Sequence, residues 1–178
     1  MILGGVDTER FRFEPEGRAE VRARYGFTDD ECVVGLLGRF DLVKGQRETI
    51  AALAKLVGEG VRNIRLLLLG FSTATLQEEV EAWIREAGME RYVTITGKVP
   101  DVTACLSALD VGVVASLWSE TIARAALEIM AAGGRSYPLQ WGHADLLPRR
   151  HWLRKGWALA GVAAAATDEA AAGLGGHC

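Results

Sequence analysis

Residues 33–45 read VVGLLGRFDLVKG, an apolar run that ends in a loop flanked by glycines. The uncharged run Val33 to Leu37 suits a strand that is buried on both faces of a sheet. The loop from Gly38 to Gly45 leads into Gln46 to Val57, where apolar residues recur on one side of a helix. The stretch therefore predicts a strand, a turn and a helix, which is how a crossover between parallel strands begins.

The same alternation of short apolar runs and amphipathic stretches recurs along the chain. It predicts three more strands, at Ile64–Leu69, Tyr92–Thr96 and Val111–Ala115. It predicts three more helices, at Leu76–Ala87, Val102–Leu109 and about Glu120–Ala132. A further helix, outside the sheet, is predicted to open at Pro15 and run through about Tyr25. We expect an α/β fold, a Rossmann-like parallel sheet with helices on both faces.

Composition narrows the class of protein. With 178 residues, 49% of them apolar and 24% charged, the chain has room for one globular domain, and a net charge of −3 argues against obligate nucleic-acid binding. Its apolar runs are far shorter than the ~20 residues of a membrane span, and Met1 opens no secretory signal, so we expect a cytoplasmic protein. Cys32, Cys105 and Cys178 are far apart and odd in number, which predicts idle or buried thiols.

The composition changes near Gly133. Residues 1–133 carry 15 Lys and Arg against 20 Asp and Glu, whereas residues 134–178 carry 5 against 3 together with all three histidines. We therefore expect a domain over residues 1–133 and a divergent tail over 134–178, with the fold incomplete at its C-terminus. The tail could reflect a shifted reading frame, a truncated gene product or a genuine replacement segment. His143 and His151, eight residues apart, lack a third well-spaced metal ligand.

Two cations, Arg39 and Lys44, lie five positions apart in the loop that follows the first predicted strand. Ligands of doubly wound sheets bind beyond the carboxyl ends of the strands, where this loop belongs. A forked guanidinium, an ammonium and a helix start together suit a phosphate group. The alternative is a solvated loop whose cations pair with Asp41 or Glu48.

Two carboxylates, Glu120 and Glu128, lie at the start of the last predicted helix and just over two turns inside it. Eight residues place them within roughly 80° of each other around the helix and about 12 Å apart along it. That spacing suits two ends of one extended ligand. Glu128 also stands in an almost wholly apolar run, where a carboxylate needs a partner.

In their order and spacing these motifs resemble the retaining glycosyltransferases of the two-Rossmann-domain (GT-B) type, those of group 1 or family 4. The resemblance runs from about Gly4 to Gly133 and covers the domain that binds the nucleotide sugar. The matching segments are Gly4–Phe11 at the domain start, Gly38-Arg39 with Lys44-Gly45, Gly97–Asp101, and the E-x7-E pair of Glu120 and Glu128.

The resemblance implies a role for each matching residue. Arg39 and Lys44, in the loop that starts at Gly38, would hold the donor diphosphate and stabilise the charge that develops on it. Glu120 would contact the donor sugar, so that Arg39, Lys44 and Glu120 form the catalytic set. Glu128 would hold the ribose hydroxyls. The remaining contacts implied are backbone amides at Thr121 and Ile122 for the phosphates, and Lys98 and Val99 beside the base.

The implied reaction is transfer of a sugar, with retention of configuration and no cofactor or essential metal, to an unknown sugar, lipid or polysaccharide acceptor at the cytoplasmic side of a membrane. Residues 121–124 replace the family's usual glycines, and the family's N-terminal acceptor domain has no counterpart in this sequence. We therefore expect nucleotide-sugar binding without transfer unless that domain or a partner chain is supplied. Two alternatives remain: a non-catalytic nucleotide-binding or partner-docking module, as in a split enzyme or a regulator, and a sugar-nucleotide epimerase.

Overall fold

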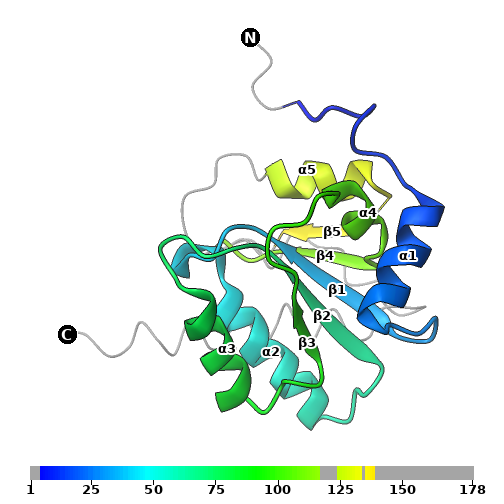
Figure 1. The fold of residues 1–178 in the computed structure, drawn as a ribbon. Helices are drawn as coiled ribbons and strands as arrows, with labels where there is room; N and C mark the ends of the chain where they lie inside the picture. Colours follow the sequence, from blue (N-terminus) through cyan, green and yellow to red (C-terminus); the bar gives the residue numbers. More distant parts are fainter. Residues whose placement is uncertain (1–4, 117–123, 134, 139–178) are drawn as a thin grey trace.

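The computed structural model describes residues 5–116, 124–133 and 135–138 (Figure 1). Within them, five parallel strands form one sheet in the order β3-β2-β1-β4-β5. The strands are β1 Cys32–Leu37, β2 Ile64–Leu69, β3 Val93–Ile95, β4 Val111–Val114 and β5 Arg135–Pro138. The helices are α1 Pro15–Tyr25, α2 Gln46–Gly58, α3 Gln77–Glu86, α4 Val102–Ser107 and α5 Arg124–Ala131, with a short 3-10 helix η1 at Leu42–Lys44.

Helices cover both faces of this sheet (Figure 1). On one face α2 and α3 bury Ile50 and Val80 against strand residues such as Leu66. On the other face α1, α4 and α5 pack around strand residues of the opposite parity, including Leu67. Because successive residues of a strand point to opposite faces, an uninterrupted apolar strand supplies both layers of the core.

The predicted α/β fold class is confirmed. Four predicted strands and the crossover helices between them are present, with ends that move by a few residues; for example, the strand predicted at Tyr92–Thr96 is Val93–Ile95. The helix predicted from Pro15 to Tyr25 has those bounds. Of the last predicted helix, Arg124–Ala131 is helical and residues 120–123 lie outside the described ranges.

Strand β5 is an addition to the predicted pattern. It lies within the segment assigned to the divergent tail and pairs with β4 in parallel, Val111 with Arg135 through Val114 with Pro138. Its sequence, RSYP, is no apolar run, so hydrophobic patterning does not reveal it. Backbone pairing with β4 is the interaction that places it in the sheet.

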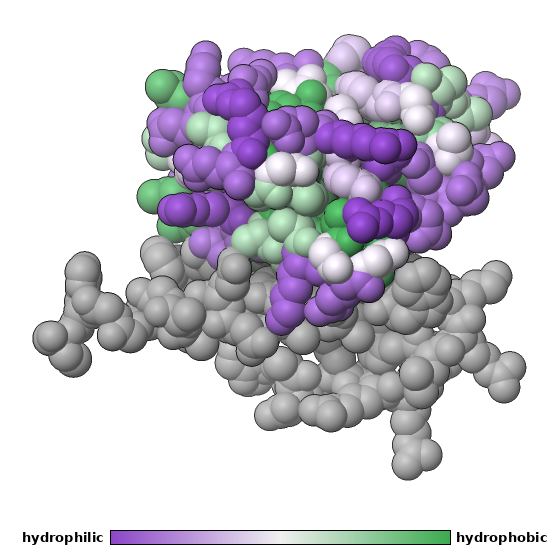
Figure 2. Space-filling view, turned by 90° about the horizontal axis from the view of Figure 1, so that it is seen from below, coloured by the Kyte–Doolittle hydropathy of each residue, from purple (hydrophilic) through white to green (hydrophobic). Residues whose placement is uncertain are grey.

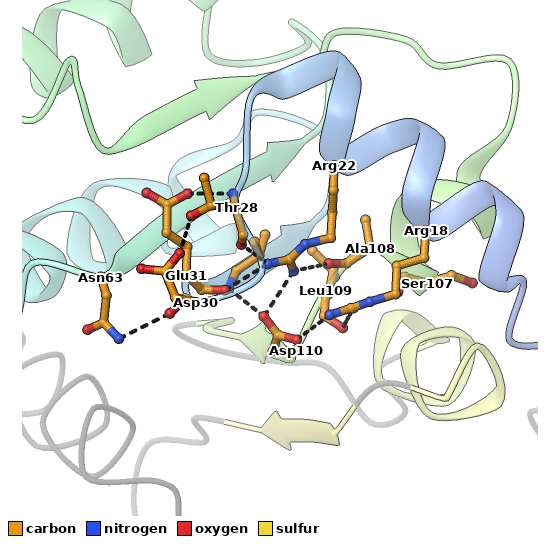
Figure 3. A network of polar contacts seen from close by, with 11 residues as sticks. Arg18, Arg22, Thr28, Asp30, Glu31, Asn63, Ser107, Ala108, Leu109 and Asp110 are labelled. Atoms are coloured by element: carbon orange, nitrogen blue, oxygen red, sulfur yellow. Dashed lines mark hydrogen bonds and ion pairs between the residues drawn. The ribbon is translucent and has the colours of Figure 1, made fainter.

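Asp110, which precedes β4, joins α1 to the amino edge of the sheet (Figure 3). Its carboxylate accepts hydrogen bonds from Arg18 Nη2 at 2.7 Å, from Arg22 Nη1 at 3.2 Å and from the backbone N–H of Val33 at 2.8 Å. The Arg22 side chain is only 6% exposed and also donates to the carbonyls of Thr28, Glu31 and Ala108. These hydrogen bonds replace most of the contacts with water that the buried guanidinium loses, although its Nε is buried without a hydrogen-bond partner.

In the coloured part of the face that Figure 2 shows, hydrophilic side chains predominate and apolar side chains form small patches among them. No helix in the described part of the chain is long and apolar enough to cross a membrane. Cys32 and Cys105 are free thiols, and burial raises the pKa of each to about 11. Both are therefore protonated and weakly nucleophilic at neutral pH.

Replacing Asp110 by Ala should lower the free energy of unfolding by about 3 kcal/mol, because it leaves two arginines and a backbone N–H without their acceptor. Urea unfolding followed by circular dichroism measures the loss. The matched control is Glu20→Ala, which removes the exposed pair between Glu20 and Arg24 and should cost about 0.5 kcal/mol at most. Equal losses in the two variants would show that the Asp110 network contributes no more than a surface ion pair.

Candidate functional site

The loop after β1, residues 38–45, is held by backbone hydrogen bonds to the last residue of β2 and to the loop that follows it. Gly38 N–H donates to the Leu69 carbonyl at 3.0 Å, and Phe40 N–H donates to the Phe71 carbonyl at 2.9 Å. The Phe40 side chain is 1% exposed and belongs to the core. The loop is thus anchored by a buried ring and two strand-like hydrogen bonds, which leaves little freedom for the residues beside them.

The far end of this loop contacts the end of β4 through Gly45. Gly45 has φ +71°, and a Cβ there would overlap the Ala115 carbonyl and lie 2.8 Å from the Ala115 Cβ. Gln46, at the start of α2, is buried and donates from Nε2 to the Arg39 carbonyl at 2.9 Å. The loop therefore sits where β1 lies between β2 and β4, the topological switch point at which doubly wound sheets bind ligands.

The two predicted cations lie on this fixed loop. The Arg39 side chain is 58% exposed, and its Nη2 lies 3.5 Å from Asp41 Oδ2. Lys44 is half-buried, and its aliphatic stem runs beside Gly38. The pairing of Arg39 with Asp41 that the sequence left open is thus present. A single contact of this length to an exposed guanidinium is weak, so Arg39 can still approach a second anion.

Lys98 and Val99 follow β3 at the same edge of the sheet. Lys98 is exposed, and its Nζ lies 4.8 Å from the centroid of the Phe71 ring. Val99 packs its side chain against the core on the α4 face. Phe71 itself follows β2 and is 41% exposed. The sequence analysis did not predict Phe71 as a site residue; the one signal for it is an aromatic residue shortly after the apolar run Leu66–Leu69.

Glu128 lies in α5 and is largely shielded. Its side chain is 16% exposed, and its Oε1 lies 3.7 Å from Nη2 of Arg124, one turn earlier. The Glu128 carboxylate therefore has a cationic partner, but the Arg124 side chain is exposed and the distance between the two charged groups is long. Such a pair holds the carboxylate only weakly.

Three of the predicted site residues, Glu120, Thr121 and Ile122, lie outside the described residues, as do His143 and His151. The structure brings the loops that carry Arg39, Lys44 and Lys98 to one edge of the sheet. Within the described ranges, no three or more His, Cys, Asp and Glu side chains are grouped so that they could hold a metal ion. What this edge offers chemically is positive charge beside an exposed aromatic ring.

The fold is a doubly wound α/β domain, and the described cations Arg39, Lys44 and Lys98 lie at the carboxyl edge of its sheet. Residues 17–134 match the family model described as glycosyl transferases group 1, and the chain belongs to that family. It has the Rossmann-like fold of a C-terminal-type domain of GT-B glycosyltransferases.

Individual relatives agree with this assignment. The chain is 29% identical over 129 residues to EpsD of Bacillus subtilis (strain 168), which is named as a glycosyltransferase, covering 72% of this chain and 33% of that protein. It is 35% identical over 95 residues to a GDP-mannose-dependent alpha-(1-6)-phosphatidylinositol monomannoside mannosyltransferase of Mycobacterium tuberculosis (strain CDC 1551 / Oshkosh), covering 53% and 24%. The chain thus spans a quarter to a third of these relatives.

A solved structure gives the same fold. Anabaena Alr3699/HepE, crystallised with UDP and glucose, superimposes with a TM-score of 0.70 at 21% sequence identity, covering 94% of this chain and 51% of that one. At this identity the likeness establishes the fold, and the site must be argued from the residues of this chain.

Replacing Gly45 by Ala should lower the free energy of unfolding by about 3 kcal/mol, because it adds a Cβ overlap to the cost of positive φ. The control is Gly26→Ala: Gly26 has φ +69° and open space around its Cβ position, so that change should cost about 1 kcal/mol. Thermal and urea unfolding compare the two variants. Equal destabilisation would mean that contact with Ala115 does not constrain the loop.

Proposed function

We propose that this chain is the donor-binding domain of a retaining glycosyltransferase and that it binds a nucleoside diphosphate sugar at the carboxyl edge of its sheet. One observation supports this above the others. The loop with Arg39 and Lys44 is fixed at the switch point between β1 and β4, where ligands of such sheets bind. Its backbone is rigid while its guanidinium is exposed, which is the arrangement needed to bind an anion without rearrangement of the loop.

Arg39 and Lys44 are the proposed ligands of the diphosphate. The guanidinium can give two parallel N–H bonds to phosphate oxygens, and the ammonium adds a point charge. As the bond between sugar and diphosphate breaks, negative charge grows on the diphosphate, and fixed cations stabilise that charge. The two residues would thereby do the work that a metal ion does in other transferases, and we propose that no metal is essential.

The other predicted residues complete the proposal. Glu120 would contact sugar hydroxyls as the third catalytic residue, and backbone amides at Thr121 and Ile122 would hold phosphate oxygens. Glu128 would accept hydrogen bonds from the ribose hydroxyls, and Lys98 with Val99 would border the base. Transfer would also need an acceptor-binding domain, and the working enzyme would act at the cytoplasmic face of a membrane. The acceptor and the sugar stay open.

Arg39→Ala and Lys44→Ala should each abolish detectable binding of UDP and GDP while leaving the fold intact, because each removes a cation from the diphosphate. Isothermal titration calorimetry on the full chain measures binding, and circular dichroism checks the fold. Arg12→Ala is the control: Arg12 is also exposed and pairs locally with Glu14 at 3.9 Å. Unchanged affinity in the two loop variants would refute the assignment of this loop.

Glu128→Gln should weaken binding of uridine or guanosine as well as of the nucleotide sugar, because a neutral amide accepts hydrogen bonds from ribose less strongly than a carboxylate does. Arg124→Ala separates this role from a structural one, since it removes the ion pair of Glu128 but keeps the carboxylate. If Arg124→Ala reproduces the loss, the ion pair is what matters. Nucleotide binding without turnover beside an acceptor-domain chain would favour a non-catalytic module.

A further inference from the structure

Gln46, the first residue of α2, is a buried polar residue beside the proposed diphosphate site. Glutamine is mostly exposed in proteins, whereas this side chain is 2% exposed. Its Nε2 donates to the Arg39 carbonyl at 2.9 Å, so the buried amide has the partner that its burial requires. That partner lies seven residues earlier in the chain. The hydrogen bond therefore joins the end of the loop with the two cations to its beginning.

The peptide group between Arg39 and Phe40 is held from two sides. Its carbonyl accepts the hydrogen bond from Gln46, and its N–H donates to the Phe71 carbonyl at 2.9 Å. A trans peptide group is planar, and its C=O and N–H point in opposite directions. One bond thus comes from α2 and the other from the loop after β2. Together they fix the backbone from which the Arg39 side chain extends.

The loop also brings Lys44 back beside its first residue. The Lys44 Cγ and Cδ would lie 3.7 and 3.6 Å from a Cβ at Gly38, so the lysine stem passes alongside the residue before Arg39. Inside the loop, the Lys44 N–H donates to the Asp41 carbonyl at 2.8 Å and closes η1. The Gln46 hydrogen bond closes the remainder of the loop. The two cations therefore extend from backbone segments that are fixed relative to each other.

We propose that Gln46 is a positioning residue that sets the separation of Arg39 and Lys44 to suit two linked phosphates, an inference that rests on the proposed function. One cation is enough to bind a monophosphate. A diphosphate uses both cations only when their separation matches that of its two phosphoryl groups. Tying the loop closed therefore favours a nucleoside diphosphate over a monophosphate, because the freedom of the two cations is lost during folding and not on binding.

The test compares UDP with UMP, and GDP with GMP, on the full chain and on its Gln46→Met variant. Methionine has a side chain of similar length but no N–H donor. Gln46→Met should weaken the diphosphates about tenfold, because a misplaced cation loses its contact with the second phosphate. Binding of the monophosphates should stay nearly unchanged. Ligand-observed NMR titration measures the affinities, and circular dichroism checks the fold.

Thr49→Val is the matched control. Thr49 also lies in α2, is 1% exposed, and donates from Oγ1 to the Gly45 carbonyl at 2.7 Å. The same carbonyl accepts the Thr49 N–H at 3.0 Å, so the variant removes a buried hydrogen bond that does not span the loop. Its preference for diphosphates should equal that of the wild type.

If Gln46→Met does not fold, Gln46→Asn takes its place, because it keeps a side-chain amide that is one methylene shorter and falls short of the Arg39 carbonyl. Equal losses of UDP and UMP affinity in the Gln46 variant, an unchanged preference for UDP, or the same loss of preference in Thr49→Val would each overturn the inference while the proposed function stands. A folded wild-type chain that binds neither UDP nor GDP refutes the proposed function, and this inference with it.

Discussion

The pairing of β1 on both of its edges is the constraint on which the rest of the structure depends. β1 pairs with β2 over six residues and with β4 over three, so it lies inside the sheet and is buried on both faces. Because β2 and β4 lie on opposite sides of β1, the loop that follows β1 begins between the ends of these two strands. That geometry places the loop of Arg39 and Lys44 between the ends of β2 and β4, where Gly45 meets Ala115 and Phe40 meets Phe71.

The two edges of the sheet use charge differently. At the amino edge the Asp110 carboxylate accepts hydrogen bonds from Arg18, Arg22 and the backbone N–H of Val33. Its negative charge is therefore paired within the fold. At the carboxyl edge Arg39 is 58% exposed, and its ion pair with Asp41 is a single contact at 3.5 Å. Charged groups bonded to several partners have no capacity left for a ligand, whereas a weakly paired cation has most of its donors available. The contrast indicates that charge at the amino edge stabilises the fold, and it supports the proposal that the carboxyl edge binds an anion.

The helices and strands that depend on local hydrophobic patterns can be predicted from the sequence. Ile64–Leu69 is apolar except for Arg65 and forms β2 over those bounds, because a strand buried on both faces needs no alternation. The Asp110–Arg18 pair spans 92 residues and has no local signature. β5 is placed by pairing with β4 and not by an apolar pattern. Within the site, loop order predicts that Arg39 and Lys98 share an edge, but the exposed Phe71 ring between them belongs to no periodic pattern and appears only in three dimensions.

The ion pair between Arg39 and Asp41 bears on how an anion would be bound. Asp41 also caps η1, since its Oδ1 accepts the Val43 N–H at 3.2 Å, so its carboxylate stays in place when Arg39 turns away. The Arg39 side chain is 58% exposed and that of Asp41 18%, so giving up their single contact at 3.5 Å costs about 1 kcal/mol, whereas a bidentate bond to a phosphate is among the stronger polar contacts. Exchange of partners is therefore favourable. If Arg39 binds the diphosphate as proposed, its pairing with Asp41 in the free protein would restrict the guanidinium in advance and lower the entropy lost on binding.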